Sequence, residues 1–449
     1  MRRAAMAVVV SACVCGVTGA IPAAHASSGS LAAGTVLKVV QYHGYELSVP
    51  ASWPVYQLAA GSDQCVRYDV HAVYLGVPGA NQDCPPGLVG RTETVSFGGP
   101  PVEREASAVV VQRVPLRGQP AVIVQDARER VLSMMLSAPS APAITATYGA
   151  DPSLVQQVLA SVRRLNYQNS KRADPELKST AAAAPDTTLG PPLSPPLGHA
   201  PPVTLAKGPL PGFDTCTAPS LATMRAWRAR FAATAIYIGG EEAACDYGNL
   251  TPQWIKAVRS MGWRLLPTYV GLQAPCDSFS GKISRKPVNA AAQGKTDAEW
   301  AVEDAQNFGL GRGTPIYDDM EAYNSGKPRC VNAVLTFLDA WTRQLNAEGY
   351  VSGVYSSADS GIIDLDTTSM IDGHPLAEPQ SLWFALWDNA SDLNGSPYLS
   401  GNLWPPAHRS KQYEGSRWVK IRKMGLEVDL DLVNSATVRL ATVRLAGVR

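Results

Sequence analysis

The sequence predicts a mixed α/β protein in which a TIM-like (β/α) barrel with an irregular last third follows a small α+β domain. The chain has 449 residues, which is more than one ordinary domain needs. Residues 167–209 are rich in Ala and Pro and cannot bury a core, so we expect a linker there. In residues 210–438, apolar runs of strand length alternate with helical patterns, which indicates a parallel sheet.

Residues 1–26 have the features of a secretory signal peptide. Two arginines precede an apolar run from Ala4 to Ile21, and residues 24–26 supply an A-x-A cleavage site. The arginine pair is compatible with twin-arginine export. A lipid anchor at Cys13 is the second interpretation, after a cleaved secretory signal, because the apolar run continues past Cys13. No later segment is long and apolar enough to span a bilayer. We expect a secreted protein, extracellular or associated with the cell wall.

Cysteine content agrees with export, and charge limits the partners. The net charge of +1 at pH 7 argues against nucleic acid as the main partner. An even number of cysteines outside the cell predicts disulfides, and no close Cys-x-x-Cys pair supports zinc. Cys65 and Cys84 are expected to pair; the other four allow three connectivities, of which we favour the pairs between neighbouring loops. These pairs are Cys216–Cys245 and Cys276–Cys330.

Residues 34–166 predict the small α+β domain, an antiparallel sheet with a terminal helix. Short runs of alternating apolar and polar residues are separated by Gly and Pro. They lie at 36–41, 68–75, 106–112 and 143–148. Asp151 and Pro152 then begin a helix with one apolar stripe. This part carries no recognisable catalytic constellation, and its sequence does not indicate its role.

Residues 210–438 contain eight strand candidates, and eight strands alternating with helices predict a closed barrel. The candidates lie at 211–215, 234–239, 263–271, 314–321, 350–356, 381–387, 409–413 and 426–433. An open, doubly wound sheet is the alternative fold. Residues 388–408 are loop-like and residues 414–425 are too few for a crossover helix, so we expect irregular connections in the last third.

The helices between the early strands have recognisable boundaries. Ser220 and Thr251 predict the N-caps of two helices. Thr296 and Glu299 form a capping-box pattern, so we expect a third helix to begin there. An apolar stripe over residues 331–345 predicts a fourth, long helix.

Acidic and aromatic residues recur where the predicted strands end. Functional side chains of a parallel barrel collect at the carboxyl ends of its strands. This rule selects Asp214, Tyr269, Asp319, Glu321, Tyr355, Trp387, Asp388, Gln412, Tyr413, Asp429 and Asp431. For any one of the aromatic residues, core packing is the alternative. Together the set suits a carbohydrate, whose C–H faces stack on aromatic rings while its hydroxyls bond to carboxylates and amides.

Residues 316–321 form a strand that ends in three carboxylates. Side chains alternate along a strand, so Asp319 and Glu321 should face one side and Asp318 the other. Glycosidic bond cleavage requires two such acids, one protonated and one ionised. For this segment alone, a solvated acidic turn is the alternative.

The strand-end motifs also occur in a familiar order. In sequence they are Gly212-Phe213-Asp214, Asp319-Met320-Glu321, Val354-Tyr355, the strand with Trp383 and Trp387, Gln412-Tyr413 and Val428-Asp429. Together they resemble the glycoside-hydrolase-like domain of secreted actinobacterial proteins, which is related to the family 25 lysozymes (muramidases). The related lysozymes fold as a barrel of five βα units followed by three strands without regular helices.

The resemblance implies roles for the four acids. Glu321 matches the general acid and Asp319 its carboxylate partner. Asp214 and Asp429 match acids that orient the substrate or stabilise positive charge in the transition state. We expect ionised Asp319 to raise the pKa of Glu321 and keep it protonated. The aromatic residues and Gln412 selected above are the candidates for contact with a glycan.

We therefore expect an exported glycoside hydrolase-like protein that acts on a cell-envelope polysaccharide, of which peptidoglycan is one candidate. A barrel that binds a glycan without turning it over is the second hypothesis. A phosphodiesterase-type barrel with a divalent metal is the third; residues 210–438 hold only two histidines, His374 and His408, and neither is beside the acids. We expect no cofactor and no metal.

Overall fold

The computed structural model describes residues 35–98, 109–116, 119–136, 143–165, 208–400 and 403–438. Residues from Val36 onward belong to one compact unit. The predicted signal peptide lies outside the described residues, as does the predicted linker up to residue 207. Among the helices that the structure describes, none combines the length and apolar character needed to cross a membrane.

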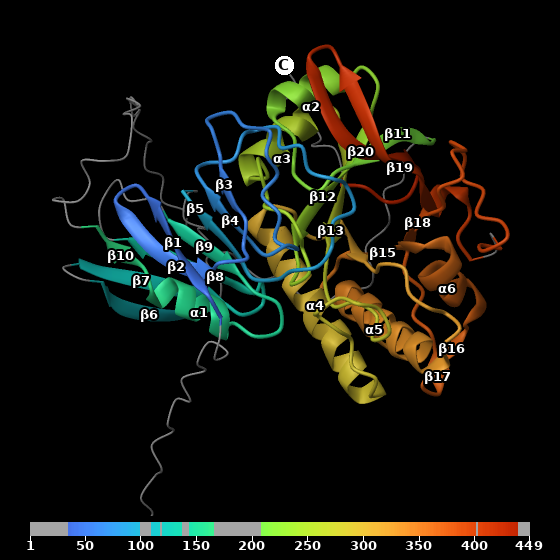
Figure 1. Cartoon of the computed structure of the whole chain (residues 1–449). Coiled ribbons are helices and arrows are strands. Elements are labelled where there is room, and N and C mark those ends of the chain that lie inside the picture. The colour runs from blue at the N-terminus through green and yellow to red at the C-terminus, as the bar shows by residue number, and fades with distance from the viewer. Residues whose placement is uncertain are drawn as a thin grey trace, which may run out of the picture. The chain divides into compact units, whose positions relative to one another are not determined.

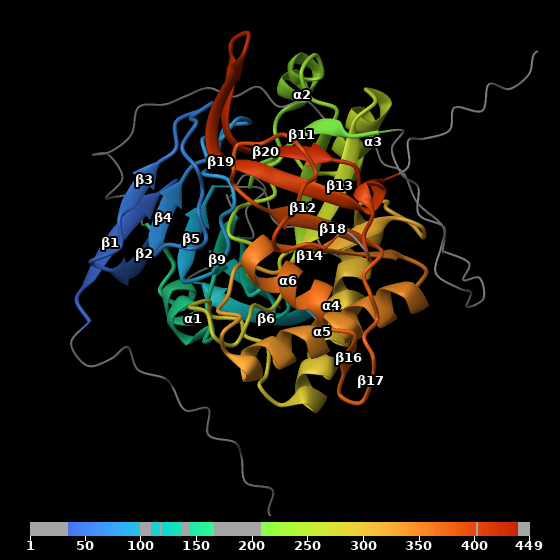
Figure 2. The ribbon, with the colours of Figure 1, turned by 90° about the vertical axis from the view of Figure 1, so that its right-hand side faces the viewer.

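A closed barrel of eight strands forms the second part of the chain (Figures 1 and 2). Its strands are β11 (Leu210–Asp214), β12 (Ala233–Gly239), β13 (Arg264–Tyr269), β14 (Pro315–Asp319), β15 (Val351–Ser357), β18 (Ser381–Ala385), β19 (Arg409–Ile421) and β20 (Met424–Val433). Each lies where the sequence predicts a strand. The barrel closes through β11 and β20, which pair from Leu210↔Val433 to Asp214↔Asp429. The open, doubly wound sheet is therefore wrong.

The last strand runs against the others, so the predicted all-parallel barrel is mixed. From β11 to β19 each neighbouring pair is parallel, whereas β19 and β20 form an antiparallel hairpin. Arg422 adopts a φ of 58° in its turn. A hairpin needs only a few connecting residues, whereas a parallel crossover needs a dozen or more. Residues 414–425 are therefore few because β19 and β20 form a hairpin, which needs no crossover helix.

Helices connect the first five strands. They are α2 (Leu221–Trp227), α3 (Pro252–Ser260), α4 (Pro287–Asn307) and α5 (Pro328–Ala347), and α4 and α5 lie side by side (Figure 1). Ser220 and Thr251 cap α2 and α3 as predicted, each accepting a hydrogen bond from a backbone N–H three residues on. The predicted helix start at Thr296 is wrong, because α4 begins at Pro287 and Thr296 lies inside it.

The connections of the last third are short and irregular, as the sequence predicts. After β15 come a π-helical turn (Ala358–Ile362), α6 (Ile363–Thr367) and a small hairpin of β16 (Met370–Ile371) and β17 (His374–Pro375). A 3₁₀ turn (Pro406–His408) leads into β19.

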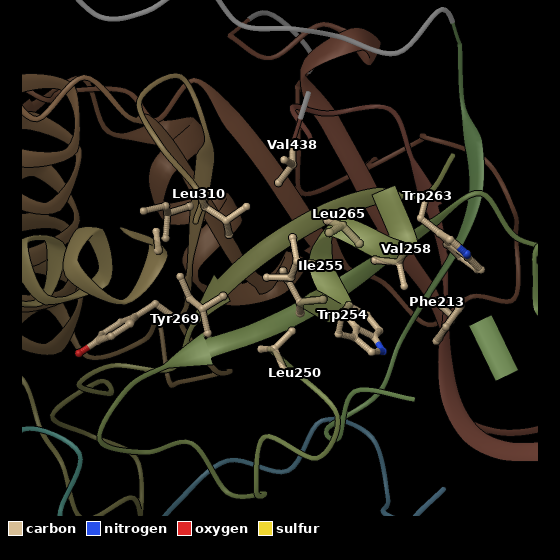
Figure 3. Packing of buried hydrophobic residues seen from close by; sticks show 14 of the residues in the cluster. Phe213, Leu250, Trp254, Ile255, Val258, Trp263, Leu265, Tyr269, Leu310 and Val438 are labelled. Atoms are coloured by element: carbon tan, nitrogen blue, oxygen red, sulfur yellow. The ribbon is translucent and has the colours of Figure 1, made fainter. Parts of the chain in front are cut away.

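The barrel buries apolar side chains on both sides of its wall. Inside, Leu266, Tyr317, Tyr355 and Trp383 belong to one cluster. Outside, between the strands and α2 to α5, a larger cluster contains Phe213, Trp254, Trp263 and Tyr269 among others (Figure 3). Parallel strands buried on both faces are nearly continuous apolar runs, which is why the sequence reveals them.

Residues 434–438 follow β20 and close one end of the barrel. Tyr317 Oη donates to the carbonyl of Ala436 at 2.7 Å, and Ser435 shares hydrogen bonds with Tyr317 and Ser410. Val438 N donates to the Leu265 carbonyl on β13 at 2.9 Å. This end lies away from the carboxyl ends of the parallel strands.

The first part of the chain is a mixed β domain with one helix. A seven-stranded sheet has the order β3 (Val55–Gln57), β4 (Ala72–Leu75), β5 (Thr94–Phe97), β9 (Ile144–Thr147), β8 (Val131–Leu136), β7 (Gln119–Asp126) and β6 (Val109–Leu116). A second sheet joins β1 (Leu37–Tyr42), β2 (Tyr45–Pro50) and β10 (Arg163–Arg164), and α1 spans Ser153–Ala160. The predicted all-antiparallel sheet is wrong, because β3, β4 and β5 run parallel.

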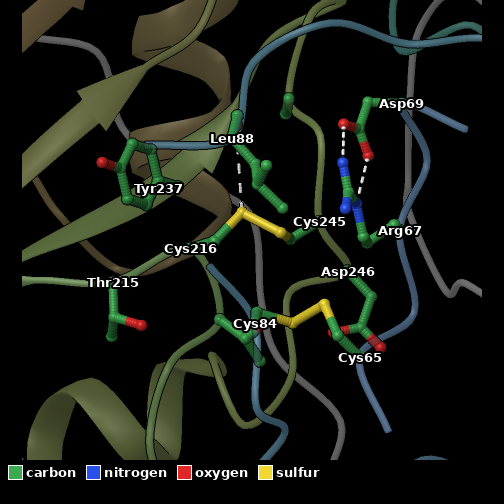
Figure 4. The surroundings of a disulfide bond; sticks show 12 residues. Cys65, Arg67, Asp69, Cys84, Leu88, Thr215, Cys216, Tyr237, Cys245 and Asp246 are labelled. Carbon is green, nitrogen blue, oxygen red and sulfur yellow. Dashed lines mark hydrogen bonds and ion pairs between the residues drawn. A yellow bond between two sulfur atoms is a disulfide. The ribbon is translucent and has the colours of Figure 1, made fainter. Parts of the chain in front are cut away.

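Three disulfides link Cys65 to Cys84, Cys216 to Cys245, and Cys276 to Cys330. The first two pack against each other in one buried cluster (Figure 4). They bring the loop that precedes β5 against the loops that follow β11 and β12.

Candidate active site

Four predicted acids gather at the carboxyl ends of the barrel strands. Asp214 ends β11 and lies directly across from Asp429 on β20. Asp319 ends β14, and Glu321 follows two residues later. The charge of Asp214 acts on the other three carboxyl groups and raises the pKa of each. The barrel thus concentrates four carboxyls in one place.

Gln412 on β19 joins the acids to two aromatic side chains. Its Nε2 donates to Asp214 Oδ2 at 2.9 Å and to Asp429 Oδ2 at 3.1 Å. Its Oε1 accepts from Tyr355 Oη at 3.0 Å and from Trp387 Nε1 at 2.8 Å. Both amide hydrogens and both acceptor lone pairs are therefore occupied. This amide holds other groups in place and has no hydrogen bond left to offer a ligand.

One carboxyl of the four reaches a cavity. Asp214, Asp319 and Asp429 are 0%, 3% and 2% exposed, whereas Glu321 is partly exposed. Glu321 lines a cavity of about 360 Å³ together with Tyr355, Trp387 and Tyr398. Trp387 is 60% exposed and packs over Gly415, where a side chain would clash with its ring. The cavity therefore offers an acid and aromatic faces, the chemistry that suits a sugar ring.

Burial raises the pKa of every acid in the group. The pKa of Glu321 rises to about 7, first through burial and then through the charges of Asp214 and Asp277. The same effect raises the pKa of Asp214 to about 6 and that of Asp429 to about 8. The pKa of Asp319 lies well above its usual range, through burial and then the charge of Glu321.

The expected cause of the Glu321 pKa is therefore corrected. We expected ionised Asp319 to raise it, but after burial the charges that raise it are those of Asp214 and Asp277, and burial also raises the pKa of Asp319 itself. Asp431, buried on β20, supports this assignment, because its own pKa is raised and it shares a hydrogen bond with Asp214 that favours ionised Asp214. Asp214 therefore ionises at a lower pH than Glu321 or Asp429.

The third carboxyl of the acidic segment lies apart. Ile316 and Met320 pack in clusters outside the barrel wall, while Tyr317 packs inside it. Asp318 is fully buried, and neither of its oxygens has a hydrogen-bond partner within the described residues. Its pKa is raised well above the usual range by burial. Asp318 is best described as a neutral carboxylic acid in the barrel wall.

Two of the predicted glycan contacts lie outside the cavity. Tyr269 is fully buried in the cluster between strands and helices (Figure 3), with its ring centroid 6.0 Å from that of Trp341. Tyr413 is half-buried and packs against the same outer cluster. Neither side chain lines the cavity, so both are corrected to packing roles.

Three residues that the sequence did not single out also contribute to the site. Tyr237 Oη on β12 donates to Asp214 Oδ1 at 3.1 Å. Gln273 accepts from Glu321 N at 2.9 Å and donates to the Asp319 carbonyl at 2.7 Å. Asp277, in the same loop, acts on the pKa of Glu321. The strand-end rule could have found Tyr237 on its predicted strand, whereas the two loop residues gave no signal.

The acids do not form a ready metal site. Among the described residues, one group of three His, Cys, Asp or Glu side chains brings its ligand atoms within 4.8 Å of one another: Cys65, Cys84 and Cys245. All three sulfurs are already in disulfides. His374 lies near Asp339, and His408 lies within hydrogen-bonding distance of the Gln380 carbonyl.

Comparison with solved structures finds matches at low sequence identity and low TM-score. The Tat-secreted protein Rv2525c of Mycobacterium tuberculosis, in complex with L-tartrate, is 17% identical over 52% of this chain and all of its own, with a TM-score of 0.36. The spore cortex lytic enzyme SleM of Clostridium perfringens is 16% identical over 51% of this chain and 68% of its own, with a TM-score of 0.35. A family 25 glycosyl hydrolase from Bacillus anthracis is 13% identical over 52% of this chain and 92% of its own, with a TM-score of 0.32. No curated protein matches the chain.

A family model matches the barrel directly. Residues 225–433 match the model described as "Rv2525c-like, glycoside hydrolase-like domain". This span contains every barrel strand except β11. The resemblance that the motifs predict is confirmed by this match, which covers residues 225–433 of the barrel.

Proposed function

We propose that this protein is an exported glycoside hydrolase that cleaves a cell-envelope polysaccharide, with peptidoglycan as the first substrate to test. One observation carries the proposal: Glu321, with a pKa of about 7, lines an aromatic cavity beside a buried group of acids. The choice of substrate rests on the predicted export and on the resemblance to the family 25 lysozymes.

In this proposal Glu321 is the general acid. A group with a pKa near 7 is about half protonated at neutral pH and can give its proton to the leaving oxygen of a glycosidic bond. Tyr355, Trp387 and Tyr398 provide surfaces on which sugar rings can stack. Gln273 fixes the backbone of Glu321 from the other side and so limits where its carboxyl can point.

The remaining acids stabilise developing positive charge. Asp214, with a pKa of about 6, supplies the negative charge of the group at neutral pH. Asp429, whose pKa burial raises to about 8, is largely protonated there, and burial also raises the pKa of Asp319. Activity should therefore need ionised Asp214 and protonated Glu321 together. This predicts a bell-shaped pH profile with limbs near pH 6 and pH 7.

Release of reducing ends tests the proposal. Purified peptidoglycan and other envelope glycans are incubated with the wild type, with Glu321→Gln and with Glu378→Gln, whose side chain is exposed before β18. We expect Glu321→Gln to lower the rate at least about 100-fold, in the range of general acid catalysis, and Glu378→Gln to leave it unchanged. A wild type that binds these glycans yet releases no reducing ends would end the hydrolase proposal.

A barrel that binds glycans without turnover is the second candidate. Asp319 is 3% exposed and its pKa is raised, so the acid that the resemblance pairs with Glu321 is neutral and out of reach of a ligand. This arrangement favours recognition over chemistry. Glycan binding by calorimetry that is equally tight for wild type and Glu321→Gln, with no product from either, would establish it.

A metal-dependent phosphodiesterase-type barrel is a third, weaker candidate. The acids do not bring three ligand atoms within 4.8 Å in the described residues, so a divalent ion would have to draw them together. Hydrolysis that is unchanged after dialysis against a chelator would remove this candidate, and hydrolysis lost on chelation and restored by a divalent cation would favour it.

A further inference from the structure

The cavity reaches the acids from one side of the barrel only. Its lining comes from Glu321 and Ala322 after β14, from β15 and the turn behind it, and from the end of β18 and the loop that follows. Among the described residues that line it, none comes from β11, β12 or β20. On that other side, Asp214 and Asp429 are 0% and 2% exposed. Some part of the chain must therefore cover them.

A turn of the first domain, residues 85–90, lies against Asp429. A Cβ atom placed on Gly87 would lie 3.5 Å from Asp429 Oδ2, which is ordinary van der Waals contact. From the opposite side, Ser416 N donates to Asp429 Oδ1 at 2.6 Å. The Asp429 carboxyl is thus enclosed between this turn and the β19–β20 hairpin.

Several contacts hold this turn in place. Gly90 N donates to the Glu242 carbonyl at 2.7 Å, and Val89 forms an antiparallel bridge with Ala243. The Leu88 carbonyl oxygen lies 3.9 Å from Cys216 Sγ (Figure 4). At the base of the turn, the Cys65–Cys84 disulfide packs on Cys216–Cys245. The turn is therefore a fixed wall, anchored to the strand ends that carry Asp214 and the β12 loop.

We infer that residues 85–90 form the closed end of the ligand cleft, so that the cavity admits the end of a glycan chain and excludes an internal segment. A polysaccharide that crosses a barrel from side to side needs open space beyond both ends of the acid group. Here the cavity that Glu321 lines opens on the β15 and β18 side, and a second cavity, lined by Glu241 and Leu272 after β12 and β13, includes none of the four acids. A volume of about 360 Å³ lies at the low end of small-molecule pockets, about 300–1,000 Å³, and suits a short terminal segment. The choice of a glycan as ligand rests on the proposed function.

Chemical labelling of carboxyl groups tests the wall without any glycan. A water-soluble carbodiimide with an amine nucleophile is applied to the full chain, and labelled peptides are quantified by mass spectrometry. We expect Glu321 to be labelled and Asp429 to be at least tenfold slower. Replacement of residues 85–88 by two glycines should bring Asp429 to within about threefold of Glu321. A wild type that labels Asp429 as fast as Glu321, or a shortened turn that changes nothing, would overturn the inference.

Oligosaccharide binding to the Glu321→Gln variant then tests which class of ligand the cavity admits. The probes are one envelope oligosaccharide with free ends and the same oligosaccharide with bulky groups on both ends. We expect the blocked probe to bind at least tenfold more weakly, and the shortened turn to restore its binding. Equal binding of both probes to the protein with an intact turn would overturn the inference. Failure of both probes to bind would instead count against the proposed function, while the labelling result still decides whether the wall exists.

A second variant tests the role of the turn without shortening it, in case the shortened turn misfolds. Gly87→Trp adds a large side chain beside Asp429, and Gly44→Trp is its matched control. Both glycines have a positive φ, 62° and 77°, but a Cβ atom placed on Gly44 would have no atom within 4 Å. We expect Gly87→Trp to weaken the free-ended probe at least tenfold and Gly44→Trp to leave it unchanged. Equal effects of the two variants would contradict the role of the turn.

Discussion

The substitution Gln412→Met tests whether one amide organises the acid group. Met is close to Gln in length, so the change removes hydrogen bonds and leaves little cavity. Four partners lose their bond: Asp214, Asp429, Tyr355 and Trp387. The first three are buried, whereas Trp387 is 60% exposed and can turn to water. Each buried polar group left without a partner costs about 1–3 kcal/mol. We therefore expect the free energy of unfolding to fall by about 3–5 kcal/mol, allowing for some penetration by water.

Urea denaturation at pH 7, followed by circular dichroism, measures this loss. The denaturation midpoint should fall while the slope m stays unchanged, because the same surface is exposed on unfolding. Gln344→Met is the matched control: its amide donates to Glu299 and Glu348 on the outer side of α5, where water can replace it. We expect it to cost no more than about 0.5 kcal/mol. A Gln412→Met loss below about 1 kcal/mol, or equal to that of Gln344→Met, would refute the organising role.

Three further predictions concern the acids and the loop beside them. The pKa of Asp429 rises from 3.8 to about 8 on folding, so its contribution to stability is complete below pH 3.8 and is lost as pH rises through 8. Urea denaturation midpoints measured at pH 5, 7 and 9 should therefore fall less steeply with pH in Asp429→Asn than in the wild type. An unchanged dependence of the midpoint on pH would contradict this. Asp318→Val removes two unpartnered buried oxygens and should be neutral or stabilising by about 1 kcal/mol in thermal unfolding, whereas a clear loss would reveal a partner that Asp318 needs. Replacing Cys276 and Cys330 by Ser opens a loop of 54 residues and should cost about 4 kcal/mol on the chain-entropy model. Activity should fall as well, because Asp277 follows Cys276 directly and Gln273 lies three residues before Cys276. A double variant with wild-type stability would exclude this constraint.

The barrel strands were predictable because both of their faces are buried. The candidate active site was predictable only in part. Runs such as residues 234–239 and 350–356 need no alternation, since one face meets the barrel interior and the other meets helices. The antiparallel direction of β20 is compatible with the short connection before it, but the position of the hairpin turn at Arg422, with its positive φ, was not predictable from length. Tyr269 was misplaced because the strand-end rule ignores which face a side chain takes: alternation along β13 puts Tyr269 on the outer face with Leu265, whereas Leu266 faces the interior.

The positions of the acids were predictable from the sequence, but which of them carries the negative charge was not. Asp214 ends the first strand, and Asp429, in the middle of the antiparallel β20, lies beside it because closure of the barrel pairs the first and last strands. Which acid carries the charge depends on burial and on a shared hydrogen bond with Asp431, and both arise only in the folded protein. The role of Gln412 is likewise a tertiary fact, because its four partners come from four different strands or loops.

Closure of the barrel by β11 and β20 also decides how the chain tolerates shortening. Leu210–Asp214 finds its antiparallel partner only in the last described strand, and residues 434–438 then cover the far end. A chain that stops before Met424 would leave β11 and β19 each with a row of unpaired backbone N–H and C=O groups. Such edges pair readily with other chains. Chains shortened at the C-terminus should therefore aggregate during expression, and a stable fragment should retain the chain through Val438.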